Sequence, residues 1–125
     1  MVTELTLESF HATIENNDTV IVDFWAPWCG PCRSFAPTFE QTAAEHPGIT
    51  FTKVNTEDQQ DLAGQFDIRS IPTLMVFREQ ILLYAQPGAL PKSQLDQLIT
   101  QVKSLNMDDV RREIAAQDLQ NQQQG

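Results

Sequence analysis

The stretch VDFWAPWCGPCRSFAP, residues 22–37, contains the only two cysteines of the chain, Cys29 and Cys32. It overlaps a continuous β-branched and aromatic run at residues 19–26 (TVIVDFWA), which is typical of a strand buried on both faces. The apolar spacing from Pro31 to about Glu45 then predicts a helix, with Pro37 inside it as a kink. The two cysteines therefore lie at a strand-to-helix junction.

Strands and helices alternate on both sides of this junction. The remaining apolar patterns predict helices at residues 7–15, 58–67 and 91–105, and strands at residues 49–55, 73–77 and 81–86. Predicted strands and helices alternate up to residue 78 and are followed by a hairpin and a closing helix. This order indicates an α/β fold. We expect a mixed central β-sheet flanked by helices on both faces.

The C-terminal residues differ in character from the rest. Residues 1–105 account for one domain, whereas residues 106–125 (NMDDVRREIAAQDLQNQQQG) have one weak apolar stripe and a glutamine-rich end. This extension is predicted to form a helix of two or three turns followed by a flexible tip. An expression scar or a truncation remains an alternative explanation of the tip.

The charge balance narrows the possible partners. The chain has 125 residues, 17 of them acidic and 8 basic, for a net charge of −9. Such an excess argues against nucleic acid or an anionic membrane as the main partner. The N-terminus lacks the basic and apolar regions of a secretory signal, and no run approaches the ~18 to 20 apolar residues of a membrane span. We expect a cytoplasmic protein with mostly reduced thiols, although a removed signal peptide remains an alternative.

Three roles are conceivable for a close cysteine pair. A structural disulfide would close a very small loop and stabilise the fold little. A zinc site needs two further ligands, and the only histidines, His11 and His46, lie at unrelated places. We therefore expect no metal site, although two chains could share a metal. The third role is a reactive dithiol.

The local pattern favours the reactive role. Cys29 precedes the first turn of the predicted helix, where unpaired N–H groups and the helix dipole favour a thiolate. Cys32 lies one turn on, close enough to attack Cys29, and is expected to be the more buried of the two. Asp23 lies within the apolar strand, so burial should raise its pKa toward neutrality and let it accept the proton of Cys32.

Five motifs together resemble the thioredoxin family over about residues 3–105. They are WCGPC, VDFWAPWCGPC, KVNTEDQ, DIRSIPTLMVF and PGALPKSQL. A CxxC motif beside a βαβ pattern is a known signature of thioredoxin-like redox proteins. The resemblance implies a thioredoxin fold and a protein-disulfide reductase that works through a mixed disulfide with its client.

The resemblance also implies cofactors and partners. No cofactor is expected to be bound, because the Cys29–Cys32 disulfide is itself the redox-active group. Electrons would come from NADPH through a thioredoxin reductase, and the substrates would be disulfide-containing client proteins. We expect a monomer that binds neither nucleic acid nor membrane.

By the same resemblance, Cys29 is the nucleophile and Cys32 the resolving thiol. Asp23 matches the family's buried carboxylate, and Lys53 matches the lysine near it. Pro72 matches the cis-proline that faces the cysteines, and the backbone of Ile71 is expected to bind extended client chain as an added strand. The expected client-binding residues are Trp28, Gly30, Pro31, Ile71, Pro72, Gly88 and Ala89.

Some alternatives stay open at the level of sequence. Asp23 could be a hydrogen-bonded buried acid and Lys53 a solvated lysine, while Trp25 is expected in the core and Trp28 at the site. A redox-independent binding or chaperone-like module is the alternative function. The hairpin FREQILL (residues 77–83) lacks the asparagine-glycine turn common in the family, which leaves its turn geometry open.

Overall fold

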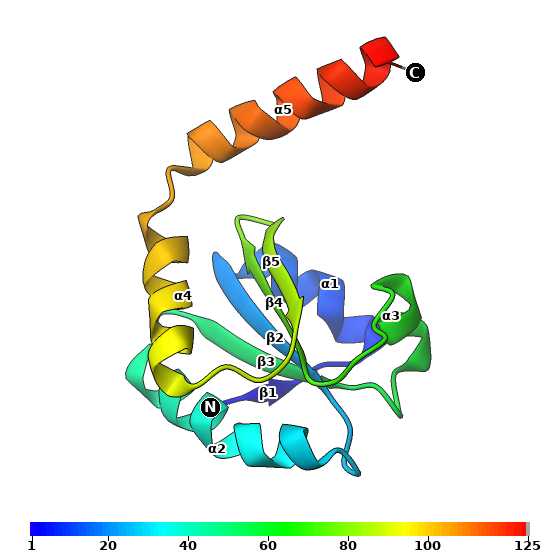
Figure 1. The fold of residues 1–125 in the computed structure, drawn as a ribbon, viewed down its shortest axis with the longest axis vertical. Coiled ribbons are helices and arrows are strands. Elements are labelled where there is room, and N and C mark those ends of the chain that lie inside the picture. The colour runs from blue at the N-terminus through cyan, green and yellow to red at the C-terminus, as the bar shows by residue number, and fades with distance from the viewer. Residues whose placement is uncertain (125) are drawn as a thin grey trace.

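A five-stranded mixed sheet forms the centre of the molecule, in the order β1-β3-β2-β4-β5 (Figure 1). The computed structural model describes residues 1–124. The elements are β1 (Thr3–Glu4), α1 (Leu7–Asn16), β2 (Thr19–Trp25), α2 (Gly30–Glu45), β3 (Thr50–Asn55), α3 (Gln60–Gln65), β4 (Thr73–Arg78), β5 (Ile81–Pro87), α4 (Lys92–Ser104) and α5 (Met107–Gln124). β1, β3 and β2 are parallel, whereas β4 and β5 are antiparallel to their neighbours. The predicted mixed α/β architecture is confirmed.

The sheet separates two apolar cores. Successive residues of a strand point to opposite faces, so β2 contributes to both cores. The core under α1 and α3 takes Val20, Val22 and Phe24 from β2. The core under α2 and α4 takes Ile21. Asp23 follows Ile21 on that second face, which places its carboxyl group on the side covered by the cysteine-bearing helix α2.

Local signals explain where the first helices begin. Thr6 is the N-cap of α1, in a capping box in which the side chains of Thr6 and Ser9 each accept a hydrogen bond from the other's backbone N–H. Cys29 is the N-cap of α2, and Pro31 stands in its first turn, where a missing N–H costs nothing. Helix α2 continues past Pro37 to Glu45. The junction therefore has the predicted strand-to-helix form.

Two parts of the chain differ from the sequence-based expectation. β1 was not predicted, because two residues carry no periodicity and become a strand only through pairing with β3. Instead of the expected two or three helical turns, the extension forms an 18-residue helix, α5, that runs to Gln124. Residues 108–124 contain no glycine or proline, and most of them are good helix formers. The final residue of the predicted tip, Gly125, lies outside the described residues.

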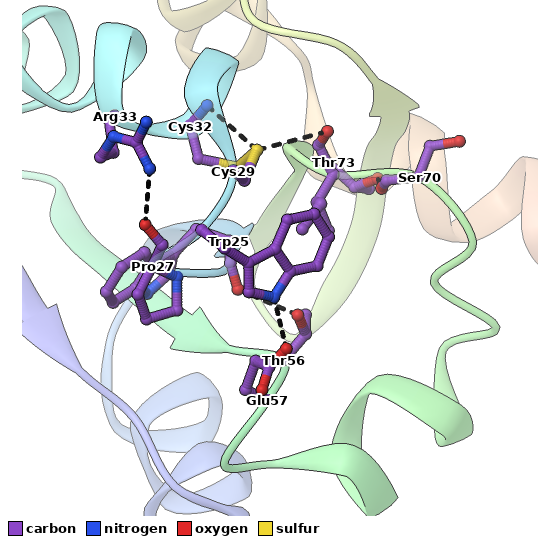
Figure 2. Close-up of a disulfide and its surroundings, with 11 residues drawn as sticks. Trp25, Pro27, Cys29, Cys32, Arg33, Thr56, Glu57, Ser70 and Thr73 are labelled. Carbon is purple, nitrogen blue, oxygen red and sulfur yellow. Dashed lines mark hydrogen bonds between the residues drawn. A yellow bond between two sulfur atoms is a disulfide. The ribbon is translucent and has the colours of Figure 1, made fainter.

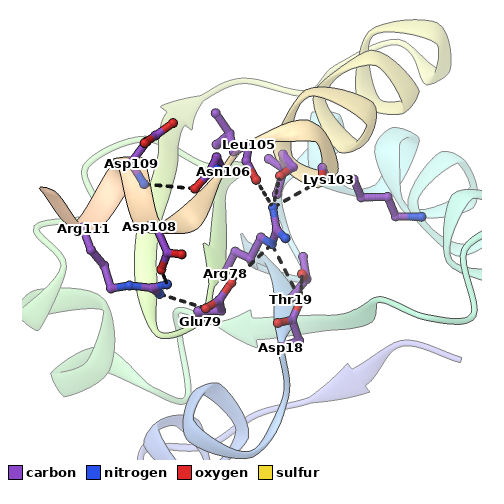
Figure 3. Close-up of polar contacts among 11 residues, drawn as sticks. Asp18, Thr19, Arg78, Glu79, Lys103, Leu105, Asn106, Asp108, Asp109 and Arg111 are labelled. Carbon is purple, nitrogen blue, oxygen red and sulfur yellow. Dashed lines mark hydrogen bonds and ion pairs between the residues drawn. The ribbon is translucent and has the colours of Figure 1, made fainter. Parts of the chain in front are cut away.

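Helix α5 projects away from the domain, at the end of the sheet where the β4–β5 hairpin turns (Figure 1). Arg78, at the end of β4, donates to the carbonyl oxygens of Val102 at 2.8 Å and Leu105 at 2.9 Å (Figure 3). Arg111 of α5 donates to the carboxylate of Glu79 at 2.8 Å. These contacts join the hairpin to the α4–α5 junction. None of the helices in residues 1–124 is long and apolar enough to span a membrane.

The hairpin turn forms without the glycine that its backbone favours. Glu79 and Gln80 have φ angles of 50° and 69°, in the left-handed region required at both central positions of a two-residue type I′ turn. The N–H of Glu79 donates to the carbonyl of Asp18 at 2.7 Å. The hairpin therefore has a two-residue turn, Glu79–Gln80, although it lacks the asparagine-glycine pair.

Candidate active site

Cys29 and Cys32 are joined by a disulfide at the start of α2, with 5.2 Å between their Cα atoms (Figure 2). The Sγ atom of Cys29 accepts a hydrogen bond from the backbone N–H of Cys32 at 3.2 Å. Arg33 closes the loop from the outside, donating to the carbonyl of Pro27 at 2.9 Å. An N-terminal N–H thus points at the sulfur of Cys29, the geometry that stabilises a thiolate once the disulfide is reduced.

The expected difference in burial between the two cysteines is almost absent. Cys29 is 4% exposed and Cys32 is 3% exposed. In the disulfide both sulfur atoms belong to one small ring, which Trp25 and Ile71 help to cover. What distinguishes Cys29 is its position, because its Sγ lies 3.8 Å from the carbonyl oxygen of Ile71 on the neighbouring loop.

Asp23 is a buried acid on the α2 side of the sheet. Only 4% of the residue is exposed, and within residues 1–124 its Oδ1 atom has no hydrogen-bond partner. Burial raises the pKa of Asp23 to about 7, and the positive charge of Lys53 opposes that rise. A carboxyl group with this pKa exchanges its proton readily near neutral pH.

Lys53 is the partner of Asp23 on the adjacent strand β3. Its Nζ atom lies over the ring of Trp25, 4.8 Å from the ring centroid. Trp25 is partly buried beside the disulfide, so it contacts both the core and the site. Sequence reasoning placed Trp25 in the core and missed its contact with the lysine.

Trp28 is the large exposed side chain beside the cysteines, with 64% of its surface accessible. Its indole N–H donates to the carboxylate of Glu57, which follows β3. Sequence reasoning did not select Glu57. Its position could have identified it, because Glu57 comes shortly after β3, the parallel neighbour of β2. A residue at that position lies at the same edge of the sheet as the cysteines.

The remaining predicted client-binding residues form the other side of the site. The Ile71–Pro72 peptide bond is cis, and the N–H of Gly88 donates to the carbonyl of Pro72 at 2.7 Å. Gly88 has a φ of 105°, a conformation that glycine adopts without strain. Ala89 follows it and is exposed. The loop after β5 is thereby held next to the loop that faces the disulfide.

Gly30 and Pro31 occupy the first turn of α2, between the two cysteines. Pro31 is exposed, and a side chain at Gly30 would meet no atom within 4 Å. Within residues 1–124 no three metal-ligating side chains cluster together. Of the predicted site residues, the structure places Ile71 against the cysteines, Gly88 against Pro72, and Lys53 beside Asp23 on the neighbouring strand.

The family model for thioredoxin matches residues 1–101. The chain belongs to the thioredoxin family. It is 50% identical over 117 residues to "Putative thioredoxin 2" of Streptomyces coelicolor, a match that covers 94% of this chain and 87% of that protein. It is 43% identical to thioredoxin of Haemophilus influenzae, over 74% of this chain and 88% of that protein.

Solved structures agree with this membership. Plasmodium falciparum thioredoxin superimposes with a TM-score of 0.74 at 34% identity, over 80% of this chain and 98% of that chain. Chloroplastic thioredoxin z gives a TM-score of 0.78 at 30% identity, over 83% of this chain and 96% of that chain. The central sheet and its helices are therefore those of the thioredoxin fold.

Membership in the family settles the class of reaction. The protein is a thiol-disulfide oxidoreductase that reduces protein disulfides through the Cys29–Cys32 couple. Thioredoxins use this redox-active disulfide in place of a prosthetic group, and they act with thioredoxin reductase and with disulfide substrates. The alternative of a redox-independent binding module is not favoured.

The comparisons also bear on the extension. The match to the Streptomyces coelicolor protein spans 117 residues of this chain of 125, so it reaches at least residue 117 and includes the first half of α5. The match to the Haemophilus influenzae protein covers a smaller part, 74% of this chain. The similarity to that protein therefore continues beyond the thioredoxin domain into residues 106–117.

Proposed function

We propose that this thioredoxin works as a general reductase of client disulfides, with Cys29 as the attacking sulfur. The observation that carries the proposal is the hydrogen bond from the backbone N–H of Cys32 to the Sγ atom of Cys29 at the start of α2. The same N–H would stabilise a negative sulfur, and the unpaired N–H groups of the first turn add to its field. A thiolate is the form that attacks disulfides.

In this sequence of steps, the thiolate of Cys29 attacks one sulfur of the client disulfide. The client S–S bond breaks, a mixed disulfide forms, and the first client sulfur leaves as a thiolate. Cys32 then gives its proton to Asp23 and attacks the Sγ atom of Cys29. The second client sulfur leaves, and the Cys29–Cys32 disulfide of the structure is formed.

Asp23 is proposed as the acceptor because it is buried on the α2 side and has a pKa of about 7. A carboxylate of ordinary pKa would hold a proton too weakly to take one from a thiol near neutral pH. Lys53 lowers that pKa, which keeps a share of Asp23 ionised and ready to accept. The two residues are thus assigned complementary roles.

Client chain is proposed to bind between Trp28 on one side and the Ile71–Pro72 loop on the other. The carbonyl of Pro72 is already used by Gly88, so the backbone of Ile71, beside Cys29, is the part assigned to pairing with an extended client. Gly30, Pro31 and Ala89 complete this surface. Main-chain pairing of this kind suits clients of varied sequence.

The electron donor is proposed to be an NADPH-dependent thioredoxin reductase that docks on the same surface. The active unit is proposed to be a monomer in the cytoplasm, where such a reductase keeps the couple reduced. The Gly-Pro pair between the cysteines supports the reducing direction, because oxidases and isomerases of the superfamily usually carry a histidine before the second cysteine. A cationic histidine would stabilise the reduced form and make a stronger oxidant.

Reduction of insulin with dithiothreitol as electron source tests the proposal. The wild-type protein should accelerate insulin precipitation, and Cys29→Ser should remove the acceleration. Cys32→Ser should trap client proteins as mixed disulfides at Cys29, because the resolving thiol is gone. Equal trapping by Cys29→Ser and Cys32→Ser would contradict the assigned roles.

A redox titration tests the direction independently. The Cys29–Cys32 couple should have a potential near the value of about −270 mV known for thioredoxin itself. A potential of about −120 to −180 mV would instead indicate an oxidase or isomerase. Turnover with NADPH and a thioredoxin reductase would then test the proposed electron donor.

A further inference from the structure

Lys53 stands between two carboxylates in the sheet. It is the β3 partner of Asp23 on β2, and on its other side it is the partner of Glu4 on β1. Partner residues on neighbouring strands point to the same face. The ammonium group therefore has one acidic neighbour in the buried site and another that is exposed at the edge of the sheet.

Within residues 1–124 the ion pairs closer than 4.0 Å do not include Lys53. Its Nζ atom lies instead over the ring of Trp25, 4.8 Å from the centroid. Trp25 is two residues after Asp23 on β2, so both side chains leave the strand on the same face. The ring thus attracts the ammonium group toward β2, the strand of Asp23, and away from β1, the strand of Glu4.

We propose that Trp25 is a positioning residue that holds the Lys53 ammonium group beside Asp23, in competition with Glu4. A lysine side chain is long and flexible, and Glu4 is exposed at the end of a two-residue strand. Without the indole ring, the ammonium group is free to move toward Glu4 or into water. The charge that acts on Asp23 is then weakened, although neither Asp23 nor Lys53 has been altered.

The charged surroundings of Asp23 make this effect measurable. Lys53 on β3 is the charged group, within residues 1–124, that lowers the pKa of Asp23 against the effect of burial. The partner of Asp23 on β4 is the apolar Leu74. Helix α2 packs on the same face of the sheet as Asp23, and its Cys32 is held in the disulfide and does not titrate. In the oxidised protein, the proton affinity of Asp23 therefore reports the position of one lysine.

The test is a 13C NMR titration of the Asp23 carboxyl group in the oxidised full-length protein. Trp25→Leu should raise the pKa of Asp23 by about half a unit or more, a roughly threefold gain in proton affinity. The conservative Trp25→Phe should restore most of the wild-type value, because a benzene ring also attracts cations. No change in Trp25→Leu would overturn the proposal.

A background without Lys53 separates the positioning role of Trp25 from its packing role. In the Lys53→Met background, Trp25→Leu should not raise the pKa of Asp23, because no ammonium group is left at position 53 to be displaced. An equal rise in both backgrounds would show that Trp25 acts through burial alone, and would overturn the proposal. If Trp25→Leu does not fold, Trp25→Met, which also lacks an aromatic ring, takes its place in the same comparison.

Substitution of Glu4 provides a second test of the proposal. Glu4→Gln should lower the raised pKa of Asp23 in the Trp25→Leu variant, because the competing carboxylate is gone, and should have almost no effect while Trp25 is present. An identical effect in both backgrounds would remove Glu4 from the proposal. The inference builds on the proposed role of Asp23, but the titration measures the carboxyl group directly. Failure of the insulin assay would therefore leave this result intact.

Discussion

The guanidinium group of Arg78 is hydrogen-bonded to the carbonyl oxygen of Leu105, 2.9 Å away, where α4 ends and the C-terminal extension begins. The same nitrogen donates to the carbonyl of Val102 at 2.8 Å. Carbonyl groups in the last turn of a helix lack partners within the helix, and a cation there also interacts favourably with the helix dipole. One side chain of the hairpin thus caps α4 and ties the extension to the sheet.

Arg78→Met should lower the free energy of unfolding by roughly 1 to 2 kcal/mol, because hydrogen bonds from a charged donor to the part-buried carbonyl of Val102 and the exposed carbonyl of Leu105 are lost. Urea denaturation measures the change. Arg112→Met is the matched control, since within residues 1–124 Arg112 forms an ion pair only with the exposed Asp109, and the loss of this pair should cost less than about 0.5 kcal/mol. Equal losses in the two variants would contradict the capping role.

Removal of residues 106–125 should leave the rate of insulin reduction within about twofold of the full-length rate. This corresponds to a change in the activation free energy of less than about 0.5 kcal/mol. Helix α5 starts at the hairpin end of the sheet, whereas Cys29 follows the opposite end of β2 (Figure 1). Steady-state assays of the truncated and full-length proteins provide the comparison. A loss of about tenfold or more would place α5 in the catalytic reaction.

Gln80→Gly should stabilise the protein by about 0.5 to 1 kcal/mol, since Gln80 has a φ of 69° and glycine adopts this conformation without steric cost. The gain is reduced by the greater freedom of glycine in the unfolded chain. Thermal or urea unfolding measures it. Ala85→Gly in β5 is the control and should destabilise; destabilisation by both substitutions would contradict the assigned turn geometry.

Asp23→Asn should change the pH dependence of stability. The pKa of Asp23 is raised from 3.8 to about 7 in the folded protein, so the folded state binds more protons than the unfolded state between these pH values. Stability therefore falls as pH rises through this range. At pH 8 the variant should be more stable than the wild type by up to about 4 kcal/mol, and below about pH 3 this difference should vanish.

Urea denaturation of both proteins from pH 3 to 8 checks this prediction. A stability difference that is independent of pH would show that the Asp23 carboxyl group is not titrating in the predicted window. The same variant should resolve the mixed disulfide more slowly, because an amide in place of the carboxylate cannot accept the proton of Cys32. Single-turnover release of a reduced client measures that step.

Much of the site was predictable because its signals are local. Cys29 and Cys32 are separated by two residues, and the patterns on either side of them specify a strand and a helix, which places a sulfur at a helix N-terminus. Asp23 is surrounded in the sequence by apolar strand residues, and that alone predicts burial and a raised pKa. The roles of Ile71, Pro72 and Gly88 came from resemblance, and their proximity to the disulfide came from the structure.

The contacts missed by sequence reasoning join residues that are far apart in the chain. Glu57 reaches Trp28 because β3 and β2 end at the same edge of the sheet, and Lys53 reaches Trp25 because the two strands are parallel neighbours. β1 exists only because β3 offers it an edge. No periodicity in a single segment encodes such pairings.

The sequence by itself determined most of the elements, the order of strands and helices, and the reactive pair, because side-chain spacing and burial preferences act within a few residues. Only the tertiary structure decided which strand lies beside Asp23, where the charge of Lys53 rests, and how Arg78 anchors the extension. These features depend on the register between strands, which is set by the packing of two cores at once.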